Sequence, residues 1–402
     1  MSDYASDDLI NEIFERLPAK SLLRFRSLSK SWCSHIQSPD FIHRHALRSR
    51  KKTPKILIRH STLCDRKYID MYTIHSEDQF VSSNPEWLDV SIPAVKFPKG
   101  MGNRLIGKIM GSCNGVLCLF HYNKNTISLW NPSIRHVTTL PSAPNHHRAS
   151  LVGIGFDPSI DDYKIVRISH NRSFVYTLKT RVWCPIASPT TEVRGRQEFC
   201  ACFFNGALHW VVEYGNYEIS RYILTFHLTT HVFGKIFLPN PNWLTRELTI
   251  INGSLAVIPV NIGLYQPPKG KDNRIWILKE YNNVPFWSNA YKFGQAGLEF
   301  FPYQEGKSAL QLTTNGHILL NFTHARNSGY RNMYGVYNSE TGRWDPSMIM
   351  QFQHSSCKHI ETYVESLELL DTKLGQKKIN KTDEIASHNV TLRKSELSKY
   401  FY

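Results

Sequence analysis

The chain has 402 residues, of which 41% are hydrophobic and 20% are charged, a composition that indicates a folded globular protein and excludes a largely disordered one. No run approaches the roughly 18 uninterrupted apolar residues of a membrane helix, and the acidic start of the chain is unlike a signal peptide. We therefore expect no membrane partner and a soluble protein of the cytoplasm and/or the nucleus.

The net charge of +15 raises the question of nucleic-acid binding, which depends on clustered Lys and Arg. Only the run from Arg48 to Lys52 is compact, and the other cations are spread over predicted turns and strand edges, where solvated lysine is common. We therefore do not expect nucleic acid as a partner. A partner that is itself strongly basic is also disfavoured, because two positively charged proteins repel each other at long range.

The first element in chain order is a helix that Ser6 can cap and that Pro18 ends. Its apolar residues repeat with the period of one helix face: Leu9, Ile10, Ile13, Phe14 and Leu17. A second short helix follows Pro18 and carries Leu22, Leu23 and Phe25.

Ser29 can cap a third helix, in which Trp32, Cys33 and Ile36 share a face before Pro39 ends it. Three helices in about 35 residues cannot bury so many large side chains among themselves. The pattern alone leaves two readings open, docking on a partner protein or packing on the domain that follows.

The segment DDLINEIFERLPAKSLLRFRSLSKSWCSHIQSPDFIHRH resembles the F-box of the large plant family of F-box proteins, through its Leu-Pro, Lys-Ser-Leu-Leu-Arg-Phe-Arg and Ser-Lys-Ser-Trp motifs. The resemblance implies a module that binds a Skp-type adaptor and, through it, a cullin scaffold. It implies adaptor contacts at six matching positions: Leu9, Ile13, Pro18, Leu22, Leu23 and Leu28. It also implies that Phe25, Trp32 and Ile36 hold the helices together.

One position departs from the family pattern. Family members usually carry Leu-Pro before the first helix, where this chain has Ala5-Ser6. Loss of one apolar anchor at a protein interface can cost roughly 1 to 4 kcal/mol. We therefore expect docking that is weakened and not abolished.

After the basic run, short alternating segments replace the helical pattern and predict β-strands. Asn-Gly pairs typical of tight hairpins introduce several of them, at Gly115, Gly206, Gly253 and Gly316, and Asp161-Asp162 occupies a comparable turn. The intervals between these glycines are 91, 47 and 63 residues, which fit propeller blades with one insertion near residues 266–273.

A second pattern of two strands around a polar turn recurs in VYTLKTRVWCPI, ILTFHLTTHVFGKIFLP, YGVYNSETGRWDPSMI and, more loosely, LWNPSIRHVTTLP. Each pairs with a hairpin to make about four strands, the size of one blade. We count five such units and expect a sixth from residues 55–97, completed by the segment ETYVESLELL so that the ring closes without open edges.

This region resembles the F-box-associated domain of plants, through GSCNGVLCL, LWNPSIR, GFDPSIDDYKIVRI, NGALHWVV, IWILKEY and YVESLELL in that order. The resemblance implies a kelch-like β-propeller that binds a target protein, without naming the target. The expected fold class is α+β multidomain: a three-helix F-box (1–45), a basic linker (46–54), a mainly antiparallel all-β, six-bladed propeller-like domain (55–370) and a flexible basic tail (371–402).

No motif indicates catalysis, and we expect no cofactor and no metal site. The eight cysteines include no Cys-x-x-Cys pair, and Cys200 and Cys202 are read as reduced thiols on one face of a strand. His146-His147 lies in a predicted loop, and His209 is read as a hydrogen-bonded core residue. Five tryptophans in strand patterns are read as packing between blades: Trp183, Trp210, Trp276, Trp287 and Trp344.

The function expected from the two resemblances is that of a non-enzymatic receptor subunit of a Skp–cullin–F-box ubiquitin ligase. The helices would dock on the adaptor, and the propeller would present a protein target for ubiquitination and degradation. The alternative is a propeller that binds carbohydrate or nucleic acid without degrading anything, with a structural N-terminus. A propeller enzyme is the least supported hypothesis, because no nucleophile and base lie at suitable spacing.

Overall fold

The structure is a computed structural model, and it describes sixteen stretches of the chain. They are 7–64, 67–77, 108–121, 124–144, 151–169, 172–190, 200–214, 220–241, 248–257, 274–281, 285–292, 305–311, 316–326, 329–344, 350–351 and 355–370. Four sequence predictions lie outside these residues: the Ala5-Ser6 departure, the His146-His147 loop, the insertion at 266–273 and the tail at 371–402. No helix of the described part is long and apolar enough to cross a membrane.

Four helices open the described chain: α1 (Asp7–Arg16), α2 (Ala19–Phe25), α3 (Lys30–Ile36) and α4 (Pro39–Ser49). Pro18 precedes α2 as its N-cap with extended backbone, and the Ser29 side chain accepts a hydrogen bond from the Trp32 amide to cap α3. These boundaries confirm the three helices that periodicity predicted.

The fourth helix was not predicted, because Pro39 was read as the end of α3. The structure instead places Pro39 in the first turn of α4, where a proline costs no hydrogen bond, and the Ser38 hydroxyl accepts from the Phe41 amide at 3.3 Å. The helix runs to Ser49, so it crosses the predicted boundary at residue 45.

The rest of the described chain is β-structure in six antiparallel sheets. The strands of the first three sheets are β1 (Lys55–Cys64), β2 (Lys67–Ser76), β3 (Lys108–Cys113), β4 (Val116–His121), β5 (Thr126–Asn131), β6 (His136–Thr139), β7 (Leu151–Asp157), β8 (Asp162–Ile168), β9 (Ser173–Thr177) and β10 (Val182–Ile186). Those of the other sheets are β11 (Cys202–Phe204), β12 (Ala207–Tyr214), β13 (Ser220–His227), β14 (Phe233–Phe237), β15 (Leu248–Ile251), β16 (Ser254–Val257), β17 (Arg274–Glu280), β18 (Phe286–Lys292), β19 (Glu305–Gln311), β20 (Ile318–Arg326), β21 (Gly329–Asn338), β22 (Arg343–Trp344) and β23 (Met350–Gln351). The last strand, β24 (Ser355–Tyr363), joins the sheet of β1 and β2.

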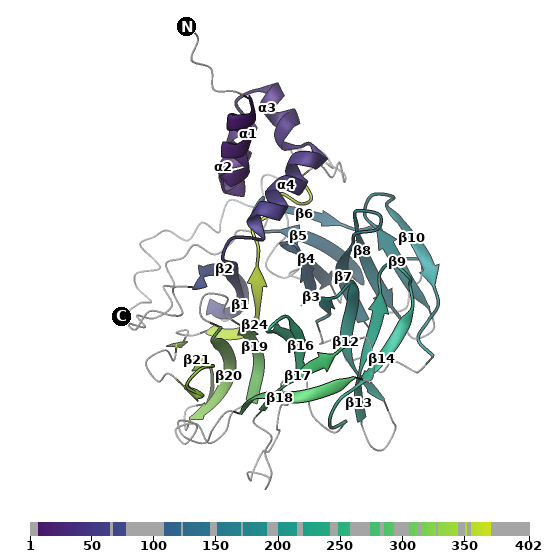
Figure 1. Cartoon of the computed structure of the whole chain (residues 1–402), viewed down its shortest axis with the longest axis vertical. Helices are drawn as coiled ribbons and strands as arrows, with labels where there is room; N and C mark the ends of the chain where they lie inside the picture. The colour runs from purple at the N-terminus through teal and green to yellow at the C-terminus, as the bar shows by residue number, and fades with distance from the viewer. Residues whose placement is uncertain are drawn as a thin grey trace. The chain divides into compact units, whose positions relative to one another are not determined.

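The sheets follow one another around a common centre, as a propeller requires (Figure 1). Five of them use consecutive strands: β3–β6, β7–β10, β11–β14, β15–β18 and β19–β22 with β23 added. Their first strands lie beside one another in chain order, β3 against β7, β7 against β11, β11 against β15 and β15 against β19. The core consists of apolar clusters between neighbouring sheets, such as Leu151, Val166, Trp210 and Phe226 between the second and third of these five.

The ring closes through the sixth sheet, in the order β2-β1-β24, where Lys55 pairs with Tyr363. The described residues therefore form five full blades and one three-stranded sheet, against six blades expected. The closing strand also ends earlier than predicted, at Tyr363, so Val364 to Leu370 leave the sheet. Pairing the first strands with the last leaves fewer open edges, which is the advantage expected of closure.

The Asn-Gly hairpins have the predicted backbone. Asn114 and Gly115 have φ of 50° and 78°, and Asn205 and Gly206 have 47° and 71°, so both central residues of each turn are left-handed. The Asp161-Asp162 turn differs, because only Asp161 has a positive φ, 50°, in a longer loop between β7 and β8. Gly115 is also required by space, since a Cβ there would lie 2.2 Å from the Val364 carbonyl oxygen.

Tryptophans join neighbouring blades, as the sequence predicted. The Trp183 indole of β10 donates to the Pro141 carbonyl beyond β6 at 2.8 Å, and Trp287 of β18 donates to the Phe237 carbonyl of β14 at 2.8 Å. Fully buried Trp210 donates to the Val152 carbonyl at 3.1 Å. Each ring therefore fills space between two sheets and satisfies its N–H there.

The segment from Val364 to Leu370, which we call the strap, is anchored on the blade formed by β3–β6. Buried Asn131 directs its Nδ2 at the Ser366 carbonyl, the Ser366 hydroxyl and the Glu368 carbonyl, at 3.2, 3.1 and 2.8 Å. Tyr163, to which Asn114 donates at 3.0 Å, hydrogen-bonds the Glu368 carboxyl. The sequence motifs LWNP, GSCNG, DYK and VESLELL are far apart along the chain, and residues of all four meet at the strap.

Replacing Glu368 with glutamine is expected to remove a pH dependence of stability. Burial raises the pKa of Glu368 to about 7 from 4.5, against the opposing effects of the Tyr163 hydrogen bond and the charge of Arg50. The stability from this carboxyl is therefore fully present below about pH 4.5 and lost as the pH rises through 7. Above that pH, Glu368→Gln should be more stable than the parent by about 3 kcal/mol in urea unfolding. The same difference at pH 4.5 and at pH 8 would contradict this account.

Candidate functional site

The candidate site is the exposed apolar surface of α1. The predicted apolar residues of one helix face, which we call the stripe, differ in exposure. Leu9 and Ile13 are each 55% exposed, while Phe14 is buried. Leu9 and Ile13 are four residues apart, so they lie on the same side of the helix, one turn apart. Two large aliphatic side chains held outward on a regular helix form a surface that another protein can cover.

The other predicted adaptor contacts differ in exposure. Leu28, in the turn between α2 and α3, is 68% exposed, Pro18 is exposed and Leu23 is partly buried. Leu22 has no exposed surface at all, so its prediction as an adaptor contact is corrected: it belongs to the interior. The sequence could not separate Leu22 from Leu23, because the helix is only seven residues long and both are leucines.

The residues predicted as the helical core lie around Phe14. The Phe14 ring centroid lies 5.0 Å from that of Phe25 and 4.6 Å from that of Trp32, and Ile36 is fully buried. Phe14 itself was grouped with the stripe and not recognised as the centre of this cluster. The aromatic contacts join α1, α2 and α3, so they hold the exposed side of α1 in place.

Helix α4 adds a layer that sequence reasoning missed. Phe41 is fully buried between His35 and His45, with ring centroids 5.1 and 6.3 Å away. The His45 Nε2–H donates to the Leu17 carbonyl at 3.1 Å, and burial lowers the pKa of His45, which favours the neutral ring. The signal was present in the sequence, since Ser38-Pro39 is a helix start and the buried residues that follow recur at helical spacing.

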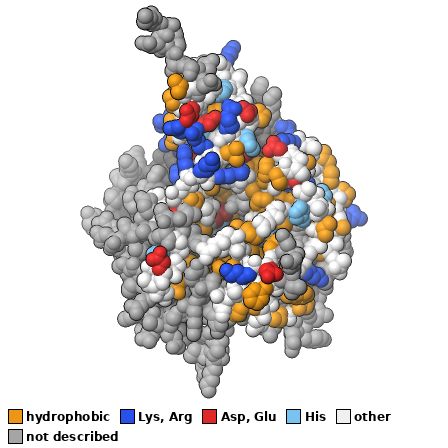
Figure 2. Space-filling view, in the orientation of Figure 1, with side chains coloured by type: hydrophobic (Ala, Val, Ile, Leu, Met, Phe, Trp, Pro, Cys, Tyr) orange, Lys and Arg blue, Asp and Glu red, His pale blue; other side chains and the backbone are white. Residues whose placement is uncertain are grey.

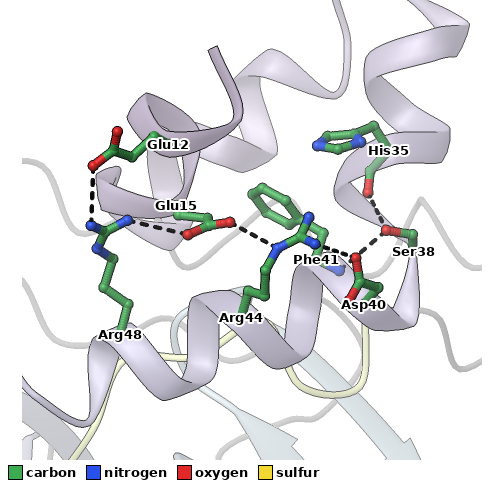
Figure 3. A network of polar contacts seen from close by, with 8 residues as sticks. All are labelled: Glu12, Glu15, His35, Ser38, Asp40, Phe41, Arg44 and Arg48. Carbon is green, nitrogen blue, oxygen red and sulfur yellow. Dashed lines mark hydrogen bonds and ion pairs between the residues drawn. The ribbon is translucent and has the colours of Figure 1, made fainter. Parts of the chain in front are cut away.

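An ion-pair network fixes α4 to α1 (Figure 3). Glu15 accepts from Arg44 Nε at 2.8 Å and from Arg48 Nη1 at 3.2 Å, and Arg48 lies 3.6 Å from Glu12. Arg44 also pairs with Asp40 on its own helix. Figure 2 shows Lys and Arg gathered with Asp and Glu over the helices. Through its contacts with Glu12 and Glu15, Arg48 of the basic run serves as a structural cation.

Replacing Glu15 with glutamine is expected to loosen α1 from α4. The Glu15 side chain is only 17% exposed and receives two charged hydrogen bonds, so its loss should cost about 1 to 2 kcal/mol. The change should appear as faster hydrogen exchange of the α1 and α4 amides, with the propeller amides unaffected. The matched control is Glu12→Gln, whose side chain is 50% exposed and should have little effect. Equal effects of the two substitutions would contradict a central role for Glu15.

The propeller residues singled out for possible chemistry have structural roles. His209 is fully buried, donates from Nδ1 to the Cys202 carbonyl at 3.1 Å and accepts at Nε2 from the Tyr281 hydroxyl at 2.6 Å. Burial lowers the pKa of His209 to about 4 and raises that of Tyr281 to about 12, so both are neutral at pH 7. This pair joins the third and fourth full blades.

The two neighbouring thiols are separated. Cys202 begins β11 and packs with apolar residues between two sheets, while Cys200 precedes the strand and its thiol donates to the Ile109 carbonyl at 3.0 Å. The expectation that both lie on one strand face is therefore corrected. Among the described residues, no three His, Cys, Asp or Glu side chains come together as a metal site.

Two family models match the chain at the regions that the helices and the ring occupy. One is the F-box domain, over residues 6–44, and the other is the F-box associated beta propeller domain, over residues 64–356. The four helices coincide with the first of these domains and the ring of antiparallel sheets with the second, so the fold is that of a protein with an F-box followed by a β-propeller. The chain belongs to the family of F-box proteins with a C-terminal F-box-associated β-propeller domain.

The chain is similar to proteins of Arabidopsis thaliana that are named as F-box proteins. The F-box/kelch-repeat protein At3g23880 is 25% identical over 385 residues, which are 90% of this chain and 94% of the relative. The F-box protein CPR1 is 25% identical over 71% of each chain. The putative F-box protein At5g62660 is 32% identical over 40% of this chain and 42% of its own. The similarity to At3g23880 therefore extends across both domains.

Proposed function

We propose that this chain is the target-recognition subunit of a Skp–cullin–F-box ubiquitin ligase. In this proposal, the α1 side with Leu9 and Ile13 contacts a Skp-type adaptor, which connects the chain to a cullin scaffold. The propeller holds a protein target that is not strongly basic and that is then ubiquitinated and degraded.

The observation that carries this proposal is the division of the α1 stripe. Phe14 suffices to pack α1 on the aromatic cluster, yet Leu9 and Ile13 remain more than half exposed. Packing on the following domain was the alternative reading for these residues, and it does not cover them in the described structure. An exposed aliphatic pair inside a matched F-box domain supports docking on a partner.

The chain needs no catalytic residue for this role. A receptor that binds the adaptor and the target together raises the effective concentration of target lysines near the ubiquitin-charged enzyme. His209 and Cys202 have structural roles that fit a non-enzymatic subunit, since His209 hydrogen-bonds Cys202 and Tyr281 between two blades and Cys202 packs with apolar residues.

The direct test is binding of the full chain to a purified Skp-type adaptor, followed by reconstitution with a cullin and a ubiquitin-charged enzyme. We expect a stable complex and ubiquitin transfer to bound protein. Targets can be collected from cells with a variant that no longer binds the adaptor. They should be less abundant on the parent chain, because the parent chain directs them to degradation. Absence of adaptor binding would favour a propeller that binds its ligand without degrading it.

A further inference from the structure

The strap touches the helices as well as the propeller. It is a continuation of β24, and its residues Ser366 and Leu367 are 2% and 0% exposed, so it is a buried part of the ring. Its anchors on Asn131 and beside Gly115 fix the backbone at this point. A side chain that leaves the strap towards the helices therefore starts from a rigid base.

Glu365 is such a side chain. Its Oε1 accepts a hydrogen bond from the Ala19 amide at 2.9 Å, although the two residues are 346 positions apart. Ala19 is fully buried at the start of α2, and the N-cap of this helix, Pro18, makes no side-chain cap hydrogen bond. A first-turn amide needs an acceptor, so the propeller supplies through Glu365 the cap that the helix lacks.

The same carboxylate also reaches the first strand of the ring. Lys55 begins β1 and its Nζ lies 3.5 Å from Glu365 Oε2. Lys55 is 47% exposed at the side chain, so this ion pair contributes little by itself. Three residues earlier, Lys52 donates to the Arg16 carbonyl at the end of α1 at 3.1 Å. The residues that connect the helices to the ring are thus held at both ends.

We propose that Glu365 is a positioning residue that holds the F-box helices in one orientation on the propeller. The inference rests on the proposed function for its biological meaning, because a fixed orientation determines which lysines of a bound target lie near the ubiquitin-charged enzyme. The orienting bond is the one to the Ala19 amide, and the ion pair to Lys55 is secondary.

The test compares Glu365→Ala, which removes the acceptor, with Glu365→Gln, which keeps a carbonyl oxygen for the Ala19 amide and loses the ion pair. Spin labels on noncanonical residues at Ser34 and Thr180, both exposed, report the distance between the helices and the ring. The parent chain and Glu365→Gln should show one narrow distance distribution, and Glu365→Ala a broadened one. An unchanged distribution for Glu365→Ala, or equal broadening for both variants, would overturn the proposal.

Proteolysis gives a second measurement that does not depend on labels. Trypsin cleavage after Lys51 and Lys52 should be about tenfold faster in Glu365→Ala than in Glu365→Gln, which is the change expected for loss of one hydrogen bond to a buried amide. Equal cleavage rates in the two variants would argue against Glu365 as the orienting residue. Cleavage within the ring in Glu365→Ala alone would indicate a folding role and would also overturn the proposal.

A reconstituted ligase separates this inference from the proposed function. Affinity for the Skp-type adaptor should be the same in Glu365→Ala as in the parent, because Leu9 and Ile13 are untouched. Ubiquitin should be attached to a larger set of the chain's lysines in Glu365→Ala than in the parent. Reduced adaptor affinity would overturn a pure positioning role. If the parent chain does not bind the adaptor, the proposed function fails, and the distance and proteolysis measurements still decide the role of Glu365.

Discussion

Replacing Leu9 and Ile13 together with aspartate is expected to weaken binding of a Skp-type adaptor by about a hundredfold or more, since exposed anchor residues at an interface are each worth about 2 kcal/mol. Both side chains are 55% exposed, so their replacement should leave the helices folded. Isothermal titration of the purified adaptor into the full chain measures the effect.

The matched control is Leu47→Asp on α4. Leu47 is also an exposed leucine of the helical region, 45% exposed, and it is not among the predicted contacts. It introduces one carboxylate, against two in the double variant, without touching the α1 surface, so adaptor affinity should change less than about threefold, the range of ordinary surface substitutions. Equal losses in the double variant and in Leu47→Asp would show that charge, and not the α1 surface, governs binding.

Replacing Asp157 with asparagine is expected to lower the free energy of unfolding of the propeller by about 3 kcal/mol, the scale of a broken buried ion pair. Asp157 is fully buried at the end of β7 and accepts from Lys164 Nζ at 2.7 Å, from the Ser159 amide at 3.0 Å and from the Thr229 hydroxyl at 2.9 Å. Burial alone would raise the pKa of Asp157, but these donors hold it well below its usual range. Both carboxylate oxygens of Asp157 accept hydrogen bonds, so in either orientation of an asparagine side chain its NH₂ group would face a donor.

The same cluster joins two blades, which is why the effect should be large. The buried Lys164 ammonium also donates to the Leu228 carbonyl at 2.7 Å and to His231 Nε2 at 3.0 Å, both beyond β13. Urea unfolding can be followed by the fluorescence of Trp210, which lies between these two blades. The control is Asp161→Asn in the same turn, whose side chain is 68% exposed and paired with exposed Lys179, and whose positive φ asparagine tolerates. If both variants lose the same stability, the buried pair is not responsible.

The proposed functions of the two parts meet in the strap. The α1 surface would hold the adaptor and the ring would hold the target. Glu365 would fix the orientation of the helices on the ring through its hydrogen bond at the start of α2. A substitution in the strap can therefore alter ubiquitin transfer without touching either binding surface. The pH dependence predicted for Glu368 concerns the same segment, so pH above 7 should loosen the anchor of the strap on the ring.

The helices and hairpins were predictable because their signals are local. A 3.6-residue period over ten residues predicted α1, and Asn-Gly pairs predicted the turns at Gly115 and Gly206, since few residues adopt positive φ. Helix α4 was missed because Pro39 can either end or begin a helix, and only the buried Phe41 decides between them. The local pattern contained both possibilities.

By itself, the sequence determined the two parts of the chain, the family resemblance and the outline of the blades, because periodicity, turn residues and motifs depend on neighbours along the chain. The tertiary structure decided which residues of the α1 stripe face outward, since that depends on where Phe25 and Trp32 pack. It also decided how the ring closes and what caps α2, because closure brings β24 beside β1 and Glu365 beside Ala19. Contacts across hundreds of residues leave no periodic trace in the sequence, and only packing reveals them.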